Sequence, residues 1–399
     1  MQVFTYNPTR PDFQDLAGAF AHKTDRELRQ AYLLYRLIQN PLLMKTLTTA
    51  GQLAVHLHLP VKNLIKHTVY KQFCGGESLT EVMEVVDKLD DEHVYTVLDY
   101  AAEAEETEEG FEQALNHILN NIAIARHSHG IGAISIKMSA LGHRSIMEKL
   151  VIDRNALSQE EEISYDLTCR RLDTICEYAA DANVSIYIDA EESWIQEPID
   201  ALTEQMMERY NRRQCIVFNT LQMYRADRLN YLEELLERAR EKGFISGIKL
   251  VRGAYWEKER DRAHAMRYAS PVYPTKEKTD ESFNKAVVMC LERLPHLHLC
   301  LATHNQESIQ LVVREVSRRK LEKLRTHLHF SQLYGMSDNL TFALAKAGFN
   351  TSKYLPYGEV DKALPYLIRR AEENTAIAGQ MSRELQLLQE ELKRRKLVS

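Results

Sequence analysis

Short apolar runs recur along the chain from about residue 93 onward, separated by longer segments in which apolar residues follow a helical period. The runs do not alternate with polar residues, which is typical of parallel strands covered on both faces. The intervening segments, such as residues 161–183 and 229–243, predict the helices that connect one strand to the next. There are eight such runs: VYTVLDY (94–100), GAISIKM (132–138), VSIYIDA (184–190), CIVFNTLQ (215–222), GIKLVRG (247–253), HLCLATH (298–304), LHFSQL (328–333) and KYLPYG (353–358).

Eight strands, each followed by a helix, predict an α/β fold, a (β/α)8 TIM-like barrel, over residues 93–376. A doubly wound open sheet is the main alternative. No GxGxxG or GxxxxGK[ST] loop follows any of the runs, however, so the phosphate-binding signature of such sheets is missing. The barrel is therefore the favoured fold.

The two ends of the chain lack the strand pattern. Residues 1–92 predict a helical N-terminal arm, with a capping box at residues 24–27 (TDRE) that marks a helix start. Residues 377–399 predict a C-terminal helix with a stripe formed by Leu385, Leu388 and Leu392 and a basic end, KRRK. This helix can close over the barrel with a solvated basic end, or it can be a weak membrane-docking element.

Composition narrows the function classes. The chain is 27% charged and 44% hydrophobic, as ordinary soluble globular proteins are, and it has no uncharged stretch of about 18 apolar residues and no signal or transit peptide. The net charge of -6 comes without a basic block in the body of the chain, which argues against nucleic acid as a partner. The six cysteines form no CxxC pair and predict buried thiols in a reducing, cytoplasmic compartment.

Polar side chains gather at the carboxyl ends of the predicted strands, where barrels of this kind place their active sites. Lys137 can simply extend from a strand end, Asp189 can cap the next helix, and His304 can be a core histidine beside a turn residue. Several strand ends nevertheless carry such groups together, and each unpaired buried charge costs several kcal/mol, which favours a functional site. The group comprises Lys137, Asp189, Gln222, Arg252, Tyr255, His304, Asn305, Leu333, Tyr334 and Tyr354, with Arg369, Arg370 and Glu373 in the helix after the last strand.

The chemistry of this group is that of anion recognition beside an apolar pocket. Lys137, Arg369 and Arg370 are more cations than one carboxylate needs, and Asp189 and Glu373 are the natural counter-ions. The arginines and Glu373 have the spacing of an exposed salt-bridged helix face, which is the alternative for them. A small amino acid or carboxylic acid with an organic cofactor is the predicted ligand pair.

Other kinds of catalytic site fit less well. No Ser/His/Asp or Cys/His pattern competes for the strand ends. The carboxylates Asp189, Glu191 and Glu192 lack the clustered histidines of a transition-metal site, so no metal is predicted.

Eight motifs follow one another between residues 137 and 374, and in this order they resemble the FAD-dependent proline dehydrogenase (proline oxidase) family. The residues of these motifs resemble the monofunctional, eukaryotic type of the family more than the bifunctional bacterial enzyme. The motifs are KMSAL (137–141), IDAEES (188–193), NTLQMY (219–224), KLVRGAYWEKER (249–260), ATHN (302–305), SQLYGM (331–336), KYLPYG (353–358) and YLIRRAEEN (366–374).

The resemblance implies noncovalent FAD at the carboxyl ends of the strands, with L-proline on the face of the flavin. The implied catalytic residues are Lys137, Arg369 and Arg370, which would bind the proline carboxylate, and Asp189, which would pair with an arginine. The implied substrate wall is Tyr255, Leu333 and Tyr354. The implied FAD contacts are Gln222, Lys249, Val251, Arg252, Gly253, Ala254, Thr275, Thr303, His304 and Glu373, where Gly253 would let the backbone approach the ligand.

The implied reaction is oxidation of L-proline to Δ1-pyrroline-5-carboxylate by hydride transfer to flavin N5, the first step of proline catabolism. Electrons would pass to a quinone during peripheral contact with the inner membrane, and a separate pyrroline-5-carboxylate dehydrogenase would oxidise the product. Lys249 departs from the arginine of many bacterial members, which makes a bidentate contact impossible. Tyr354 favours proline over hydroxyproline. The alternatives are a hydroxyproline dehydrogenase, a metal-dependent carboxylate lyase on the same barrel, and a barrel that only binds carboxylates.

Overall fold

The computed structural model describes residues 10–39, 62–101, 105–153, 155–364, 366–367 and 378–398. Eight parallel strands form a closed barrel in the order β1 to β8, which confirms the predicted fold. The strands are β1 (Tyr95–Tyr100), β2 (Ile131–Ile136), β3 (Ser185–Ile188), β4 (Val217–Gln222), β5 (Ser246–Val251), β6 (Leu297–Ala302), β7 (Leu328–Leu333) and β8 (Asn350–Tyr357).

Helices connect the strands and extend the chain at both ends. Short 3₁₀ turns η2 (Met138–Ala140), η3 (Leu294–His296) and η4 (Glu322–His327) join them, and η1 (Lys66–Tyr70) is a π-helical turn. The helices are α1 (Leu16–Ala19), α2 (Asp25–Ile38), α4 (Lys62–Ile65), α5 (Lys71–Phe73), α6 (Leu79–Asp91), α7 (Glu108–Ala125), α8 (Arg144–Ile152), α9 (Gln159–Ala182), α10 (Ser193–Tyr210), α11 (Arg228–Lys242), α12 (Trp256–Met266), α13 (Lys276–Glu292), α14 (Gln306–Arg318), α15 (Asp338–Lys346) and α17 (Ala378–Arg394).

The described residues fall into two compact units. Residues 105–331 form one unit, and residues 10–101 together with 332–398 form the other. The helices of the predicted N-terminal arm and the C-terminal helix α17 therefore share a unit with β1 and β8. The two units divide between residues 101 and 105 and between residues 331 and 332. The boundaries predicted from the sequence are at residues 92 and 377.

The unit of residues 105–331 is built on strands with fully buried aliphatic side chains, such as Ile186, Ile248 and Leu299. Facing strands also place aromatic rings together: Tyr187 and Phe218 pair across β3 and β4, with ring centroids 4.9 Å apart in an edge arrangement. These apolar contacts hold the strand ends, and the polar residues on them, in a fixed register.

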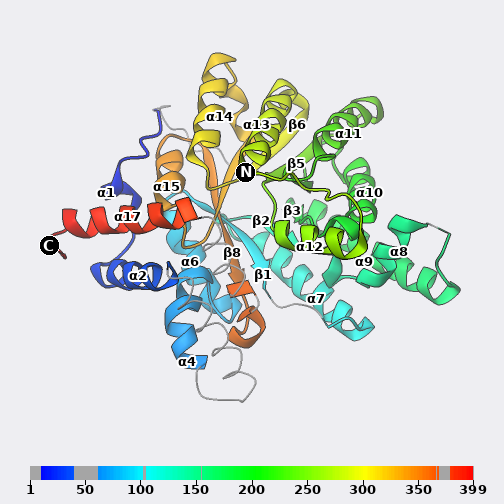
Figure 1. Cartoon of the computed structure of the whole chain (residues 1–399), viewed down its shortest axis with the longest axis horizontal. Helices are drawn as coiled ribbons and strands as arrows, with labels where there is room; N and C mark the ends of the chain where they lie inside the picture. Colours follow the sequence, from blue (N-terminus) through cyan, green and yellow to red (C-terminus); the bar gives the residue numbers. More distant parts are fainter. Residues whose placement is uncertain are drawn as a thin grey trace. The chain divides into compact units, whose positions relative to one another are not determined.

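The other unit joins the two ends of the chain. The predicted capping box is present: the Thr24 hydroxyl accepts from the Glu27 N–H, and the Glu27 carboxylate accepts from the Thr24 N–H at 3.0 Å. Helix α17 packs on α2 (Figure 1), and Leu388 and Leu392 of its stripe are buried in the shared core. Arg395 follows α17 and donates to the carbonyls of Phe20 and Lys23, so part of the basic end is engaged with the N-terminal segment.

Two further sequence predictions can be compared with the structure. All six cysteines are free thiols, five of them buried, as predicted. Within the part of the chain that the structure describes, no helix has both the length and the apolar character needed to cross a bilayer.

Candidate active site

The predicted polar residues in the first unit do lie at the carboxyl ends of strands. Lys137 directly follows β2, Asp189 follows β3, and Gln222 is the last residue of β4. Arg252 follows β5, and Thr303 follows β6. The strand ends of this unit therefore carry three charged groups and two polar ones.

Asp189 and Lys249 form an ion pair. The Lys249 Nζ lies 2.5 Å from Asp189 Oδ1, and the two side chains are 5% and 16% exposed. The ammonium group also lies 5.5 Å from the centroid of the Tyr187 ring. Among the described residues, Lys249 is thus one partner of Asp189, and the arginine pairing that the resemblance implied stays a prediction. Asp189 does not cap the following helix, because the N-cap of α10 is Glu192.

Gln222 ties together two loops at the same end of the barrel. Its Nε2 donates to the Glu191 carbonyl at 2.7 Å, and its Oε1 accepts from the Ala254 N–H at 3.0 Å. The side chain is buried, so these bonds are shielded from water. The amide therefore fixes the loop after β3 against the loop after β5.

Arg252 is anchored by three side chains. Its Nε donates to Asp280 Oδ1 at 2.5 Å, one terminal nitrogen donates to Ser308 Oγ at 2.9 Å, and the other donates to the Thr303 hydroxyl. The guanidinium lies 4.4 Å from the centroid of the Phe283 ring. Burial lowers the pKa of Arg252 from its usual value, although Asp280 acts in the opposite direction. The result is a cation held in one orientation at the mouth of β5 and β6.

The loop after Arg252 depends on Gly253. This residue has a φ of +136°, and a Cβ built on it would lie 2.4 Å from the ring of Tyr224. Both the backbone conformation and the neighbouring ring require glycine here. The requirement for glycine seen here comes from Tyr224, a residue of the protein itself, and the approach of Gly253 to a ligand stays a prediction.

The remaining predicted contacts of this unit are more open to solvent. Thr275 is exposed, and its hydroxyl caps α13 by accepting from the Lys278 N–H. Four more of these residues are half-buried: Lys137, Val251, Tyr255 and His304. Gly253 and Ala254 are exposed.

Two buried carboxylates beside Asp189 have structural partners that the sequence did not reveal. Glu191 accepts from the Ser139 N–H at 2.8 Å and from Arg144 at 3.3 Å. Glu192 pairs with Arg144 and Lys258. Burial raises the pKa of Glu191, with its bonds to Ser139 acting in the opposite direction. In the residues that the structure describes, no three His, Cys, Asp or Glu side chains converge as metal ligands would.

The other unit holds two of the three residues of the predicted ring wall, Leu333 and Tyr354. Leu333 ends β7 and packs against the core cluster of that unit, and Tyr354 is half-buried in β8. The Tyr354 carbonyl accepts from the Tyr334 N–H at 2.9 Å. Arg369, Arg370 and Glu373 lie outside the described residues, so the carboxylate clamp stays a prediction.

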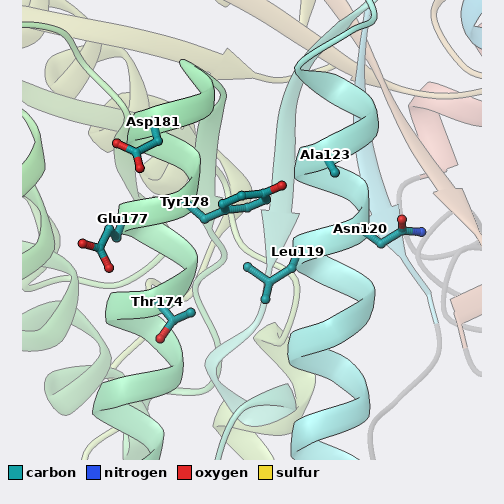
Figure 2. A pocket seen from close by; sticks show the side chains of 7 residues that line it. All are labelled: Leu119, Asn120, Ala123, Thr174, Glu177, Tyr178 and Asp181. Carbon is teal, nitrogen blue, oxygen red and sulfur yellow. The ribbon is translucent and has the colours of Figure 1, made fainter.

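A pocket lies elsewhere, between α7 and α9, with a cavity volume of about 460 Å³. Tyr178 reaches from α9 toward α7 across it (Figure 2). Its lining comes from the last turns of both helices, which precede the amino ends of β2 and β3, and includes none of the predicted site residues. The lining residues are Leu119, Asn120, Ala123, Thr174, Glu177, Tyr178 and Asp181.

Comparisons with known proteins agree with the motifs. Residues 82–383 match the family described as proline dehydrogenase. The chain is 36% identical over 323 residues to the carbapenem antibiotics biosynthesis protein CarD of Pectobacterium carotovorum, covering 81% of this chain and 83% of that protein. It is 30% identical over 416 residues to the hydroxyproline dehydrogenase of Xenopus laevis, covering 95% and 89%.

Longer relatives match over part of their length. Human mitochondrial proline dehydrogenase 1 is 36% identical over 241 residues, which are 60% of this chain and 40% of that protein. The crystal structure of proline utilization A from Bdellovibrio bacteriovorus superimposes with a TM-score of 0.71 at 20% identity, over 90% of this chain and 38% of that chain. The structural likeness concerns the fold, while the sequence match reaches across most of the barrel. The chain belongs to the proline dehydrogenase family.

Proposed function

We propose that the protein oxidises L-proline to Δ1-pyrroline-5-carboxylate, with FAD as the hydride acceptor. One observation carries the proposal: Lys137 follows β2, Lys249 lies within β5 and Arg252 follows β5, and all three cations lie inside the motifs that carry the family resemblance. Such a set suits a ligand pair with phosphates and a carboxylate.

The donor set of the first unit fits FAD. Arg252 and the Thr303 hydroxyl are held together next to the exposed residues Gly253 and Ala254, and a cation and a hydroxyl beside an exposed loop suit a diphosphate. Lys249 offers one ammonium group to the polar edge of a flavin. The residues proposed to hold FAD are Gln222, Lys249, Val251, Arg252, Gly253, Ala254, Thr275, Thr303, His304 and Glu373. The chemistry that bound FAD supplies is acceptance of a hydride at N5.

The protein's own task is orientation. In this proposal Lys137, Arg369 and Arg370 bind the carboxylate of proline, which fixes the ring carbon to be oxidised near the flavin. Tyr255, Leu333 and Tyr354 pack around the ring and exclude water, in keeping with the half-buried side chain of Tyr354. No protein base is required if proline binds with a neutral amine.

The clamp can be tested at one arginine. Arg370→Met should raise the KM for L-proline at least about ten-fold, because a hydrogen bond to a charged group contributes about 1.5–3 kcal/mol. Arg213→Met, at an exposed position, is the control and should leave the KM unchanged. An unchanged KM in Arg370→Met would refute the clamp assignment.

Hydroxyproline dehydrogenase is the second candidate function. The Xenopus laevis hydroxyproline dehydrogenase aligns with 95% of this chain, which favours it. The ring of Tyr354 would crowd a 4-hydroxyl group, which favours proline. Turnover of L-proline and trans-4-hydroxy-L-proline by the purified protein decides between them: we expect a higher kcat/KM for L-proline, and the reverse order would contradict the proposal.

We also propose the electron acceptor, the cellular location and the enzyme that uses the product. Electrons pass from FAD to a quinone during peripheral contact with the inner membrane, and the protein is otherwise cytoplasmic. A separate pyrroline-5-carboxylate dehydrogenase takes the product. These statements come from the family and are tested by quinone-dependent turnover with membrane vesicles.

A further inference from the structure

The loop between β7 and α15, residues 334–337, has an unusual backbone. Gly335 has a φ of +79° and Ser337 a φ of +53°. Glycine adopts such a conformation freely, but serine does so at a cost and only when its surroundings hold it. The loop directly follows Leu333, the last residue of β7.

The helices before β1 hold one part of the loop. The Gly335 carbonyl accepts from the Tyr35 hydroxyl at 2.7 Å and from Gln72 Nε2 at 2.8 Å. A Cβ on Gly335 would lie 2.0 Å from the Gln72 carbonyl oxygen, so no other residue fits. Tyr35 is buried in α2, which makes this a fixed attachment.

Strand β8 and the N-terminal segment hold a second part. Lys353, which is 1% exposed, donates from Nζ to the Met336 carbonyl at 2.6 Å and pairs with Asp338 Oδ1 at 2.8 Å. Lys23 and His22 face the other oxygen of Asp338, at 3.2 and 3.5 Å. The buried charge of Asp338 is therefore neutralised from β8 and from the chain before α2.

The C-terminal helix α17 binds Ser337, the residue whose positive φ is energetically unfavourable. Glu384 of α17 accepts, through Oε1, from the Ser337 N–H at 2.8 Å and from the Ser337 hydroxyl at 3.0 Å. Glu384 is 5% exposed, and α17 is anchored on α2 by the buried side chains of Leu388 and Leu392. One carboxylate oxygen thus satisfies both donors of Ser337.

We propose that Glu384 is a positioning residue that sets the part of the substrate wall formed by Leu333 and Tyr354. Leu333 directly precedes the loop, and Tyr354 is connected to it twice: its carbonyl accepts from the Tyr334 N–H, and the adjacent Lys353 binds the Met336 carbonyl. The inference rests on the proposed function, in which this wall packs around the ring of proline. It gives the C-terminal helix a role in selecting the substrate.

The test compares variants of the full-length, FAD-loaded protein. Glu384→Ala should raise the KM for L-proline about five-fold with kcat nearly unchanged, and should lower the preference for L-proline over trans-4-hydroxy-L-proline by a similar factor. Glu384→Gln keeps an acceptor oxygen and should restore both values. Glu390→Ala, at an exposed position of the same helix, is the matched control and should behave like the wild type.

A merely structural Glu384 would alter the folded fraction and leave the substrate ratio unchanged, so an unchanged ratio in Glu384→Ala overturns the proposal. Failure of Glu384→Gln to rescue overturns it as well. If Glu384→Ala does not fold, Ser337→Ala removes one of the two donors and should shift the ratio in the same direction, and no shift would count against the proposal. A wild type that does not oxidise L-proline refutes the proposed function instead.

Discussion

Replacing Gly253 by alanine tests the physical reason for a glycine in the loop after β5. The added methyl group would meet a φ of +136° and three atoms of the Tyr224 ring at 2.4, 2.5 and 2.7 Å. Tyr224 is 2% exposed, so the ring is buried and can move only by displacing its neighbours. Gly253→Ala should therefore be strongly destabilising.

The magnitude follows from two separate costs. A positive φ in a residue with a Cβ costs about 1–3 kcal/mol. Forcing a methyl group into a packed region costs a further ~1–3 kcal/mol. Gly243 provides a matched control, because it also has a positive φ, +71°, but its Cβ would meet only Arg212, at 3.9 Å. Gly243→Ala should thus incur the first cost alone.

The assay is chemical denaturation of both variants beside the wild type, with the flavin content of each purified protein as a second readout. Gly253→Ala should lower the denaturation midpoint clearly more than Gly243→Ala and should retain less flavin. Equal midpoints in the two variants would refute the argument, because the Tyr224 contact would then have no energetic effect.

Three further outcomes are expected. A double-mutant cycle with Asp189→Asn and Lys249→Met should give a coupling energy of about 1–3 kcal/mol in denaturation, and additivity would contradict the ion pair. Burial lowers the pKa of His298 to about 4. Since the unfolded value is about 6.5, the unfolded state binds more protons between these values, and stability should fall by up to about 3 kcal/mol as pH drops through this window. His298→Gln should reduce the loss of stability between these pH values. A pH profile identical to that of the wild type would argue against a lowered pKa of His298. Leu392→Ala removes a fully buried side chain from α17 and should cost about 2–5 kcal/mol in thermal denaturation, whereas a loss below about 1 kcal/mol would mean that α17 is not anchored as described.

Much of the fold is readable from the sequence because continuous apolar runs and a capping box are local signals. Strand β8 is an element whose start is not predictable from its apolar residues. It begins at Asn350, earlier than the run predicted from residue 353, because Thr351 and Ser352 are polar and yet buried. The partners of Lys353 are the Met336 carbonyl and Asp338, which only the folded chain brings next to it.

The placement of polar residues at the strand ends is predictable from the sequence, and their pairing is less so. Strand direction alone places Lys137, Asp189 and Arg252 at the carboxyl ends of their strands. The Lys249 partner of Asp189 depends on the register of three strands, and the Arg144 partner of Glu191 depends on how α8 packs, so neither is encoded by nearby residues. The carboxylate clamp of Arg369 and Arg370 stays a prediction.

The most direct test of the central claim is the visible spectrum of the purified full-length protein before and after anaerobic addition of L-proline. We predict a flavin spectrum that bleaches on addition of L-proline as the bound FAD is reduced, with formation of Δ1-pyrroline-5-carboxylate. A protein that binds FAD but keeps its oxidised spectrum in the presence of L-proline would contradict the proposed function.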